Sequence, residues 1–319
     1  MMNKTALICG VSGQDGAFLA KFLLNKGYTV WGTSKDAQGT HPNNLDVLAI
    51  RKQVKLISMV PEDFRSVLVA LKASEPHEIY YLAGQSSVGL SFEQPAETIH
   101  SIALGTLNIL EAARMLGKKP RIYNAGSSEC FGDTHGIPAD EKTPFHPQSP
   151  YAVAKSSAFW LVDNYREAYG LFVCTGILFN HESFLRPQRF VTQKIIAAAK
   201  RIAAGSDEIL ELGRLDISRD WGWAPEYVEA MWLMLQQPQA QDFVIATGQT
   251  NTLESFVQEV FKQLGIDEWQ KHVMQLEAFM RPTDISISQG DASKARDVLH
   301  WTPKYKMKDV ISLMLQYEA

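Results

Sequence analysis

Three glycines near the start of the chain, Gly10, Gly13 and Gly16, restrict the possible fold more than any other feature of the sequence. They follow a short apolar run at residues 6–9 and open residues 16–25, in which apolar side chains recur at helical spacing. Glycines let the backbone turn tightly and approach a pyrophosphate, which the free N–H groups of a helix N-terminus bind. A turn that only packs helix against strand is the alternative, but the strand–loop–helix context favours a dinucleotide site.

Strands and helices alternate through the first half of the chain. Apolar runs predict further strands, and longer stretches with helical spacing predict helices between them. The strands are expected at residues 28–32, 78–82, 121–125 and 171–179, and the helices at 66–72, 98–116 and 151–169. Because this alternation builds βαβ units with right-handed crossovers, the sequence predicts an α/β protein with a Rossmann-like, doubly wound parallel sheet.

The regular alternation ends near residue 180. Residues 181–189 are polar and contain Pro187, so we expect a loop there. Further helices are expected at 190–204, 226–236, 253–264, 293–299 and 308–317, with short strands at 210–212 and 242–246. This mixture predicts a smaller, mixed α/β substrate-binding lobe. We assign residues 1–180 to the dinucleotide-binding domain, with parts of 213–248 returning to it, and residues 181–212 and 249–319 to the lobe.

The composition argues against several classes of function. The 319 residues suit two domains, and 31 basic against 35 acidic residues leave no basic surplus for nucleic acid. No apolar stretch reaches the roughly 18 residues of a membrane span. The scattered Cys9, Cys130 and Cys174 suit neither a disulfide framework nor a zinc site, and the histidines form no metal-like cluster. We therefore expect a cytoplasmic protein without a metal.

The end of the second strand bears on the choice of dinucleotide. NAD enzymes usually place an acidic residue there to bind the 2′-hydroxyl of the adenosine ribose. Here the first side chains after the strand are Ser34 and Lys35, which suit a 2′-phosphate, while the following Asp36 opposes one. The sequence favours NADP over NAD, with Lys35 as an ordinary solvated charge as the alternative.

Tyr151 and Lys155 begin a long predicted helix and lie on one face of it. A lysine ammonium beside a phenol lowers the pKa of the phenol, which can then act as a general base. The pair alone is common, but the preceding strand ends in Ser127, Ser128 and Glu129. Because ligands bind at the carboxyl ends of parallel strands, we expect these side chains to meet in a catalytic group. Turn or capping roles are the alternative for the two serines.

Together these residues resemble the extended short-chain dehydrogenase/reductase superfamily. Within it, the chain is similar to the GDP-mannose 4,6-dehydratase family over nearly its whole length. The motifs that carry this narrower resemblance are Gly13-Gln-Asp-Gly16, Gln85-Ser86, Ser127-Ser-Glu129, Ser149-Pro-Tyr151, Phe179-Asn-His-Glu-Ser183, Phe190-Val-Thr192, Arg219-Asp-Trp-Gly222, Tyr227-Val-Glu-Ala-Met-Trp232, Asp242-Phe-Val-Ile-Ala-Thr-Gly248, Arg281-Pro-Thr283 and Gln289-Gly-Asp291.

The resemblance implies a hydro-lyase that converts GDP-mannose to GDP-4-keto-6-deoxymannose, with a hydride passing from C4 to NADP⁺ and back to C6. Tyr151 would take the proton of the C4 hydroxyl, with Lys155 as its partner. Glu129 would remove the C5 proton and assist loss of the C6 hydroxyl, while Ser127 orients the oxygens. An elimination needs this second base, which ordinary dehydrogenation does not.

Three alternatives to this activity stay open. The first is dehydration of another GDP-sugar, such as a GDP-heptose, and the second is a GDP-4-keto-6-deoxy-sugar reductase or epimerase of the same fold. The third is an NADP-binding regulator without activity, which both Tyr151 and Lys155 argue against. Glu129 and the Asn180-His-Glu-Ser183 run favour a dehydratase over a reductase.

The resemblance also implies binding residues beyond the catalytic group. Further coenzyme contacts are expected from Ser12, Gln14, Asp15, Leu82, Ala83, Gln85, His181 and Arg186, besides the glycines and Tyr151 and Lys155. Substrate contacts are expected from Ser86, Ser127, Asn180, Val191, Lys194, Arg219, Arg281 and Asp284. The two arginines would meet the diphosphate, because guanidinium forks suit phosphate oxygens. A structural ion pair with Asp216 or Asp220 is the alternative for Arg219.

Several positions depart from the family pattern. Val60 and Pro61 stand where the family has Asp-Leu beside the adenine, and residues 34–44 contain none of the arginines that reach a neighbouring subunit in the family. A homodimer through the two long helices is therefore the first expectation, with a homotetramer as the alternative. Residues 184–189 also differ from the family's substrate loop, which keeps a different GDP-sugar open.

Overall fold

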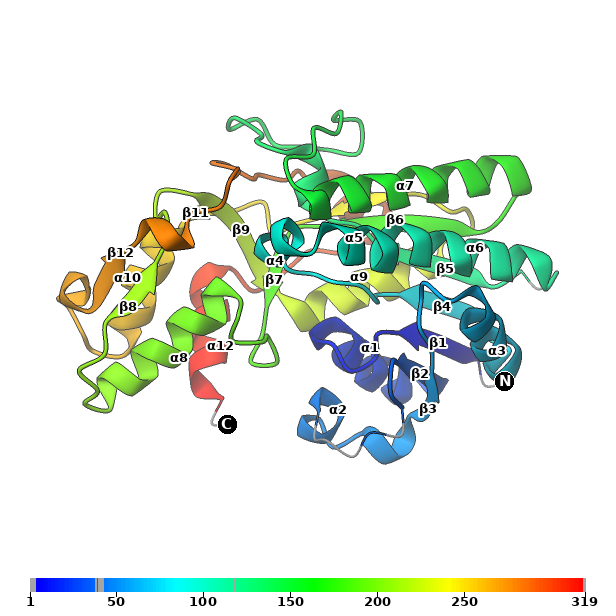
Figure 1. Ribbon diagram of the computed structural model, residues 1–319, viewed down its shortest axis with the longest axis horizontal. Coiled ribbons are helices and arrows are strands. Elements are labelled where there is room, and N and C mark those ends of the chain that lie inside the picture. Colours follow the sequence, from blue (N-terminus) through cyan, green and yellow to red (C-terminus); the bar gives the residue numbers. More distant parts are fainter. Residues whose placement is uncertain (1–3, 38, 40–42, 118, 318–319) are drawn as a thin grey trace.

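A seven-stranded parallel sheet forms the larger part of the protein (Figure 1). The computed structural model describes residues 4–37, 39, 43–117 and 119–317. The strands are β1 (Thr5–Cys9), β2 (Thr29–Ser34), β3 (Lys55–Ser58), β4 (Glu78–Tyr81), β5 (Arg121–Ala125), β6 (Val173–Leu178) and β10 (Phe243–Ile245), in the order β10-β6-β5-β4-β1-β2-β3. The order reverses between β1 and β4, which is the switch point of a doubly wound sheet. The predicted fold class is confirmed.

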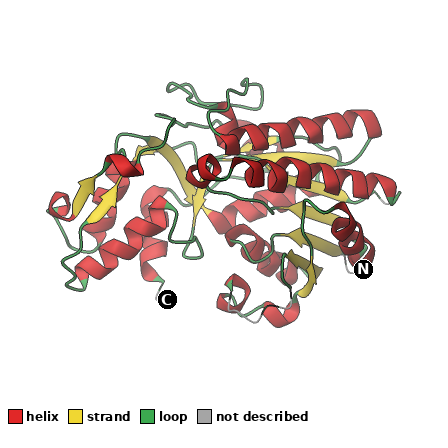
Figure 2. Ribbon diagram, viewed as in Figure 1, coloured by secondary structure: helices red, strands yellow, loops and turns green. Residues whose placement is uncertain are grey.

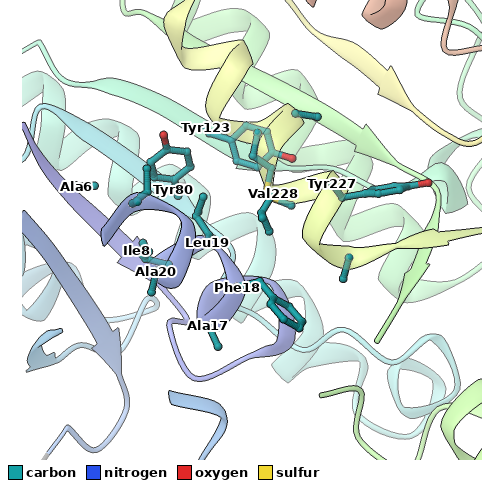
Figure 3. Close-up of a cluster of buried hydrophobic side chains, with 14 of the residues drawn as sticks. Ala6, Ile8, Ala17, Phe18, Leu19, Ala20, Tyr80, Tyr123, Tyr227 and Val228 are labelled. Carbon is teal, nitrogen blue, oxygen red and sulfur yellow. The ribbon is translucent and has the colours of Figure 1, made fainter. Parts of the chain in front are cut away.

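Alternate strand residues serve the two faces of the sheet. Ala6, Ile8, Tyr80 and Tyr123 pack toward α1 (Gln14–Asn25) and α9 (Ala224–Gln236), in the buried cluster that Figure 3 shows. Leu7, Cys9, Ile79 and Tyr81 pack toward α3 (Phe64–Ser74), α6 (Gly105–Met115) and α7 (Pro150–Tyr169) on the other face. Successive side chains of a strand point to opposite faces, so a sheet covered on both sides is apolar at nearly every position. Figure 2 shows the resulting three layers.

Local signals in the sequence set the ends of the helix that carries Tyr151. The Ser149 hydroxyl accepts a hydrogen bond from the Ala152 N–H at 3.1 Å, and Pro150 occupies the first turn. Gly170 ends α7 in the left-handed conformation at φ 61°. An N-cap serine, a proline in the first turn and a C-terminal glycine are typical helix boundaries, which explains why this helix was predictable.

The single helix expected at residues 98–116 is wrong in detail. The structure has α5 (Pro95–Ile99), a π-helical turn (His100–Leu104) and then α6. The Tyr81 hydroxyl donates a hydrogen bond to the Ser101 carbonyl at 2.6 Å, and a Cβ on Gly105 would overlap that same hydroxyl. The insertion of a strand side chain into the helix thus accompanies the π turn, as is common at such turns.

A second, smaller body with its own core lies beyond the carboxyl edge of the sheet (Figure 1). It contains α8 (Val191–Ala203), α10 (Leu253–Gln263), α12 (Met307–Gln316) and the parallel pair β8 (Leu210–Leu212) and β12 (Val273–Gln275). A three-stranded sheet of β7 (Asn180–Glu182), β9 (Ser218–Trp223) and β11 (Thr250–Thr252) adjoins it. The short helices α2 (Asn44–Val47), α4 (Val88–Glu93) and α11 (Ser293–Leu299) are the remaining α-helices among the described residues.

The loop expected at residues 181–189 is also partly wrong. His181 and Glu182 belong to β7, which pairs in parallel with β9 through Asn180–Trp221, His181–Gly222 and Glu182–Trp223. A three-residue polar strand has no apolar alternation, and a partner about forty residues away fixes it, so local pattern could not reveal it. None of the described helices is both long and apolar enough to cross a membrane.

The contact between Tyr81 and Gly105 predicts a specific destabilisation. We expect Gly105→Ala to lower the free energy of unfolding by about 1–3 kcal/mol, because the added Cβ overpacks against the hydroxyl. The cost should be smaller in a Tyr81→Phe background, where that hydroxyl is gone. Urea unfolding of the four proteins in this double-mutant cycle measures both values. An equal cost in the two backgrounds would contradict this account of the π turn.

Candidate active site

The glycine loop joins β1 to α1 as expected, and its geometry excludes side chains. Gly10 has φ +84°, and a Cβ there would lie 3.0 Å from the Ala83 Cα atom. A Cβ on Gly16 would overlap the Gly10 carbonyl and lie 2.7 Å from the Val11 Cα atom. The backbone therefore passes close to the residues that follow β4 and leaves no side chain between the N-terminus of α1 and the cavity in front of it, as a pyrophosphate site requires.

Two adjoining cavities lie at the carboxyl edge of the sheet. The first, which we call the coenzyme cavity, measures about 600 Å³ and the second, the substrate cavity, about 820 Å³. Asp15, Ser86 and Arg186 are among the residues that line both. Cavities of this size suit two large ligands placed side by side.

The structure places every sequence-predicted binding residue on one of these cavities. The coenzyme cavity is lined by Gly10, Ser12, Gly13, Gln14, Asp15, Gly16, Ser34, Lys35, Leu82, Ala83, Gln85 and Arg186. The substrate cavity is lined by Ser86, Ser127, Glu129, Tyr151, Lys155, Asn180, His181, Val191, Lys194, Arg219, Arg281 and Asp284. Residues from eight or more separate segments of the chain thus converge on one edge. Arg189 and Phe190, which were not predicted as binding residues, also line both cavities.

Tyr151 and Lys155 lie buried at the start of α7. Burial raises the pKa of the Tyr151 phenol well above its ordinary value, and a hydrogen bond with Ser127 partly offsets this. Burial lowers the pKa of the Lys155 ammonium to about 8. The ammonium donates a hydrogen bond to the Ala125 carbonyl at 2.7 Å and lies 5.8 Å from the centroid of the Tyr151 ring. The sequence predicted a lowered pKa for this phenol, but its pKa is raised, because the effect of burial is the largest.

Glu129 lies on a 3₁₀ turn (Ser128–Phe131) directly after the Ser127 N-cap, whose hydroxyl accepts from the Glu129 N–H at 3.3 Å. Burial raises the pKa of the Glu129 carboxyl, while the charges of Arg219 and Arg281 partly offset the shift. A carboxyl whose pKa is raised toward neutrality is better matched to taking and giving a proton at physiological pH. Besides the tyrosine, the site therefore holds a second group that is able to transfer a proton.

Arg219 is buried beside Asp284. Its guanidinium donates to the Ile285 carbonyl at 2.8 Å, the Ser218 carbonyl at 3.0 Å and the Asp284 carboxylate at 3.1 Å. Arg281 reaches the same carboxylate oxygen at 3.4 Å. The anticipated alternative partners are engaged elsewhere, because Asp216 pairs with Arg214 and Asp220 accepts from the Thr247 and Gly248 N–H groups. Asp284 thus holds two cations at the wall of the substrate cavity.

A buried polar network joins α1 to β7 between the two cavities. The Gln14 amide donates to the His181 carbonyl at 3.1 Å and accepts from the Ser183 hydroxyl at 2.8 Å. Arg186 donates to the His181 carbonyl and to the Glu182 carboxylate, both at 2.8 Å. Neither Glu182 nor Ser183 was predicted as a site residue. The run of polar residues after the last core strand was the signal that could have suggested one.

His181 sits between two hydrogen-bond acceptors. Its Nδ1 atom lies 2.7 Å from the Phe179 carbonyl and its Nε2 atom lies 2.9 Å from the Asp15 carboxylate. Only the doubly protonated imidazolium donates to both. Burial opposes the charge, but the charge and hydrogen bond of Asp15 outweigh burial and raise the pKa of His181. The same ion pair outweighs burial at Asp15 and lowers its pKa to about 2.

This ion pair predicts a pH-dependent contribution to stability. The stabilisation from His181 is complete below its unfolded pKa of 6.5 and is lost as pH rises through the raised folded value. That from Asp15 is complete above 3.8 and is lost only as pH falls toward about 2. We expect His181→Gln to lower the free energy of unfolding by about 1–3 kcal/mol at pH 6 and by less at pH 9. Denaturant unfolding at the two pH values measures this.

The exposed His135 provides the matched control for this experiment. Its side chain is 83% exposed, so His135→Gln should change the unfolding free energy by less than about 0.5 kcal/mol at either pH. A His181→Gln cost that is the same at pH 6 and pH 9 would contradict a charged histidine at this position.

The chain matches known proteins along nearly its full length. Residues 7–314 match the family model described as GDP-mannose 4,6 dehydratase. The chain is 42% identical to a GDP-mannose 4,6-dehydratase of Sinorhizobium fredii, covering 98% of this chain and 96% of the relative. It is 44% identical to GDP-mannose 4,6 dehydratase 2 of Arabidopsis thaliana, covering 98% and 86%.

Solved structures show the same fold at lower sequence identity. DesIV, a dTDP-glucose 4,6-dehydratase from Streptomyces venezuelae with NAD and TYD bound, superposes with a TM-score of 0.87 at 19% identity, covering 98% of this chain and 96% of that one. RMD from Pseudomonas aeruginosa complexed with NADPH superposes with a TM-score of 0.78 at 23% identity, covering 98% of both chains. The sequence identity to the two dehydratases is higher than the identity to these solved structures. By its match to the family model and to these relatives, the chain belongs to the GDP-mannose 4,6-dehydratase family.

Proposed function

We propose that this protein is a hydro-lyase that converts GDP-mannose to GDP-4-keto-6-deoxymannose with NADP as a resident coenzyme. One observation carries the proposal. Tyr151 and Glu129, two groups able to transfer protons, line one cavity together with Ser127, and that cavity adjoins the one that the glycine loop lines. A reductase or dehydrogenase needs one such group, whereas oxidation at C4 followed by elimination across C5 and C6 needs two. The full-length similarity to curated dehydratases supports the same substrate.

The coenzyme cavity fits a dinucleotide. Glycine backbone and the bare N-terminus of α1 form one wall, where any Cβ on Gly10 or Gly16 would collide. Ser34 and Lys35 line the cavity at the end of β2, and Asp36 is not among the described residues that do. This favours the 2′-phosphate of NADP, which Lys35 would bind. When bound, the nicotinamide supplies the redox chemistry, taking a hydride from sugar C4 and returning it to C6.

The protein's own residues handle the protons. Tyr151 takes the C4 hydroxyl proton in its phenolate form, which the hydrogen bond with Ser127 favours because it lowers the pKa of the phenol. Ser127 also orients the oxygen. The resulting C4 ketone acidifies C5–H, so Glu129 can remove that proton and pass it to the departing C6 hydroxyl, which leaves as water. When a hydride returns to C6, C5 takes up one proton, and this uptake balances the proton that Tyr151 accepted from the C4 hydroxyl. Each turnover therefore releases only water and leaves both side chains as they began.

The substrate cavity supplies cations for the diphosphate and polar groups for the nucleoside. We propose that Arg219 and Arg281, held together by Asp284, bind the diphosphate through their guanidinium groups. Asn180, Val191 and Lys194 would contact the nucleotide, with Ser86 near the sugar, and His181 and Arg186 would contact the coenzyme from the shared wall. Asp284 would bind the ribose once its cations turn toward phosphate.

The organisation of the chain is proposed on the same grounds. Residues 1–180 with parts of 213–248, including α9 and β10, would form the coenzyme domain, and residues 181–212 and 249–319 the substrate lobe. We propose a homodimer through α6 and α7, since Trp160 on α7 is 59% exposed and Met115 on α6 60% exposed. The buried, unpaired Cys9, Cys130 and Cys174 suit the reducing cytoplasm.

Incubation of the purified protein with GDP-mannose and catalytic NADP⁺ tests the activity. We expect mass spectrometry to show a product lighter by one water, with no net formation of NADPH by absorbance. Unchanged GDP-mannose with a folded, NADP-bound protein would contradict the proposal. A related GDP-sugar such as a GDP-heptose would then be the next substrate to test, because residues 184–189 depart from the family's loop. Net consumption of NADPH would instead identify a reductase.

Glu129→Gln tests the two-base mechanism. We expect turnover to fall about 10²–10⁴-fold, because the amide cannot take the C5 proton. Glu229→Gln, an exposed position on α9, is the matched control and should leave turnover within about twofold. Measurement of product by mass spectrometry, with circular dichroism to verify folding, separates lost catalysis from lost structure. A Glu129→Gln protein with normal elimination would exclude the role of Glu129.

A further inference from the structure

An ion-pair group lies at the wall of the coenzyme cavity. The Lys35 ammonium, at the end of β2, lies 3.1 Å from the Glu97 carboxylate on α5 and 3.5 Å from the Glu62 carboxylate. Lys35 and Glu97 both line the cavity, whereas Glu62 approaches the ammonium from outside the lining that the described residues form. The lysine thus has one carboxylate inside the cavity and another behind it.

The charges of this group disfavour the binding of a phosphate beside Lys35. Two carboxylates against one ammonium leave a local net charge of −1. The side chains of Lys35 and Glu97 are 62% and 48% exposed, so the contact between them is screened and can rearrange. A 2′-phosphate at Lys35 would have to replace Glu97 or stand beside its negative charge. A 2′-hydroxyl, by contrast, could donate a hydrogen bond to that carboxylate.

We propose that Glu97 is a coenzyme-specificity determinant, whose carboxylate competes with the 2′-phosphate of NADP for Lys35 and accepts a hydrogen bond from the 2′-hydroxyl of NAD. Glu97 therefore weakens the preference for NADP over NAD that Lys35 creates, so that the protein binds both coenzymes. Asp36, the acid next to Lys35 in the sequence, does not have this role, because it is not among the described residues that line the cavity, whereas Glu97 is. The inference rests on the proposed assignment of this cavity to the coenzyme.

Calorimetric titration of NADP⁺ and NAD⁺ into the wild-type and Glu97→Gln proteins tests the proposal without an activity assay. The amide keeps the size of the side chain and removes its charge. We expect the ratio of Kd for NAD⁺ to Kd for NADP⁺ to rise about tenfold in Glu97→Gln, chiefly through tighter NADP⁺ binding. The rise should shrink in about 0.5 M NaCl, because the group is solvent-exposed.

Glu62→Gln is the matched control, since it removes a carboxylate beside the same lysine but outside the cavity lining. We expect it to change the ratio by less than about threefold. An unchanged ratio in Glu97→Gln, or an equal rise in the two variants, would overturn the proposal. A wild-type protein that prefers NAD⁺ would contradict the NADP assignment alone, provided that Glu97→Gln still raises the ratio. If neither NADP⁺ nor NAD⁺ binds, both the coenzyme assignment and the proposed role of Glu97 are contradicted.

Discussion

The first turn of α1 has to satisfy two partners at once. Its residues line the coenzyme cavity, while the side chains of Gln14 and Asp15 contact β7 and hold the His181 segment. Because these contacts are buried, breaking one leaves a polar group without a partner, which is costly. The wall shared by the two cavities is therefore fixed in place, and the position of Arg186 on both cavities follows from it.

Burial governs the chemistry of the site. It raises the pKa of Tyr151 and of Glu129 and lowers that of Lys155. Each shift favours the neutral form, so the protein alone holds its proton-transfer groups with little net charge. Charge at the wall of the substrate cavity comes from other groups, among them Arg219 and Arg281, which Asp284 holds there. Electrostatic interactions are strong in such water-poor surroundings, and small changes in ligand charge can shift the protonation of these groups.

Much of the site was predictable because its residues are close in sequence to clear structural signals. Ser127 and Glu129 follow a buried strand, Tyr151 and Lys155 begin a well-capped helix, and the glycines join a strand to a helix. Periodicity and turn chemistry reveal such positions directly. Edge strand β3 has four residues of mixed polarity, and β7 has three polar residues, so neither shows a clear local pattern. Pairing with β2 and with β9, respectively, defines these two strands.

The sequence by itself determined the alternation of strands and helices, the glycine loop and the choice of the side chains proposed to be catalytic, since all of these depend on neighbours within a few turns. Tertiary structure alone decided which charges meet. It paired Arg219 with Asp284 across 65 residues and Lys35 with Glu97 across 62 residues, and it inserted Tyr81 into the helix predicted at residues 98–116. Local pattern contains no record of such contacts, because each depends on how distant elements pack against the same sheet.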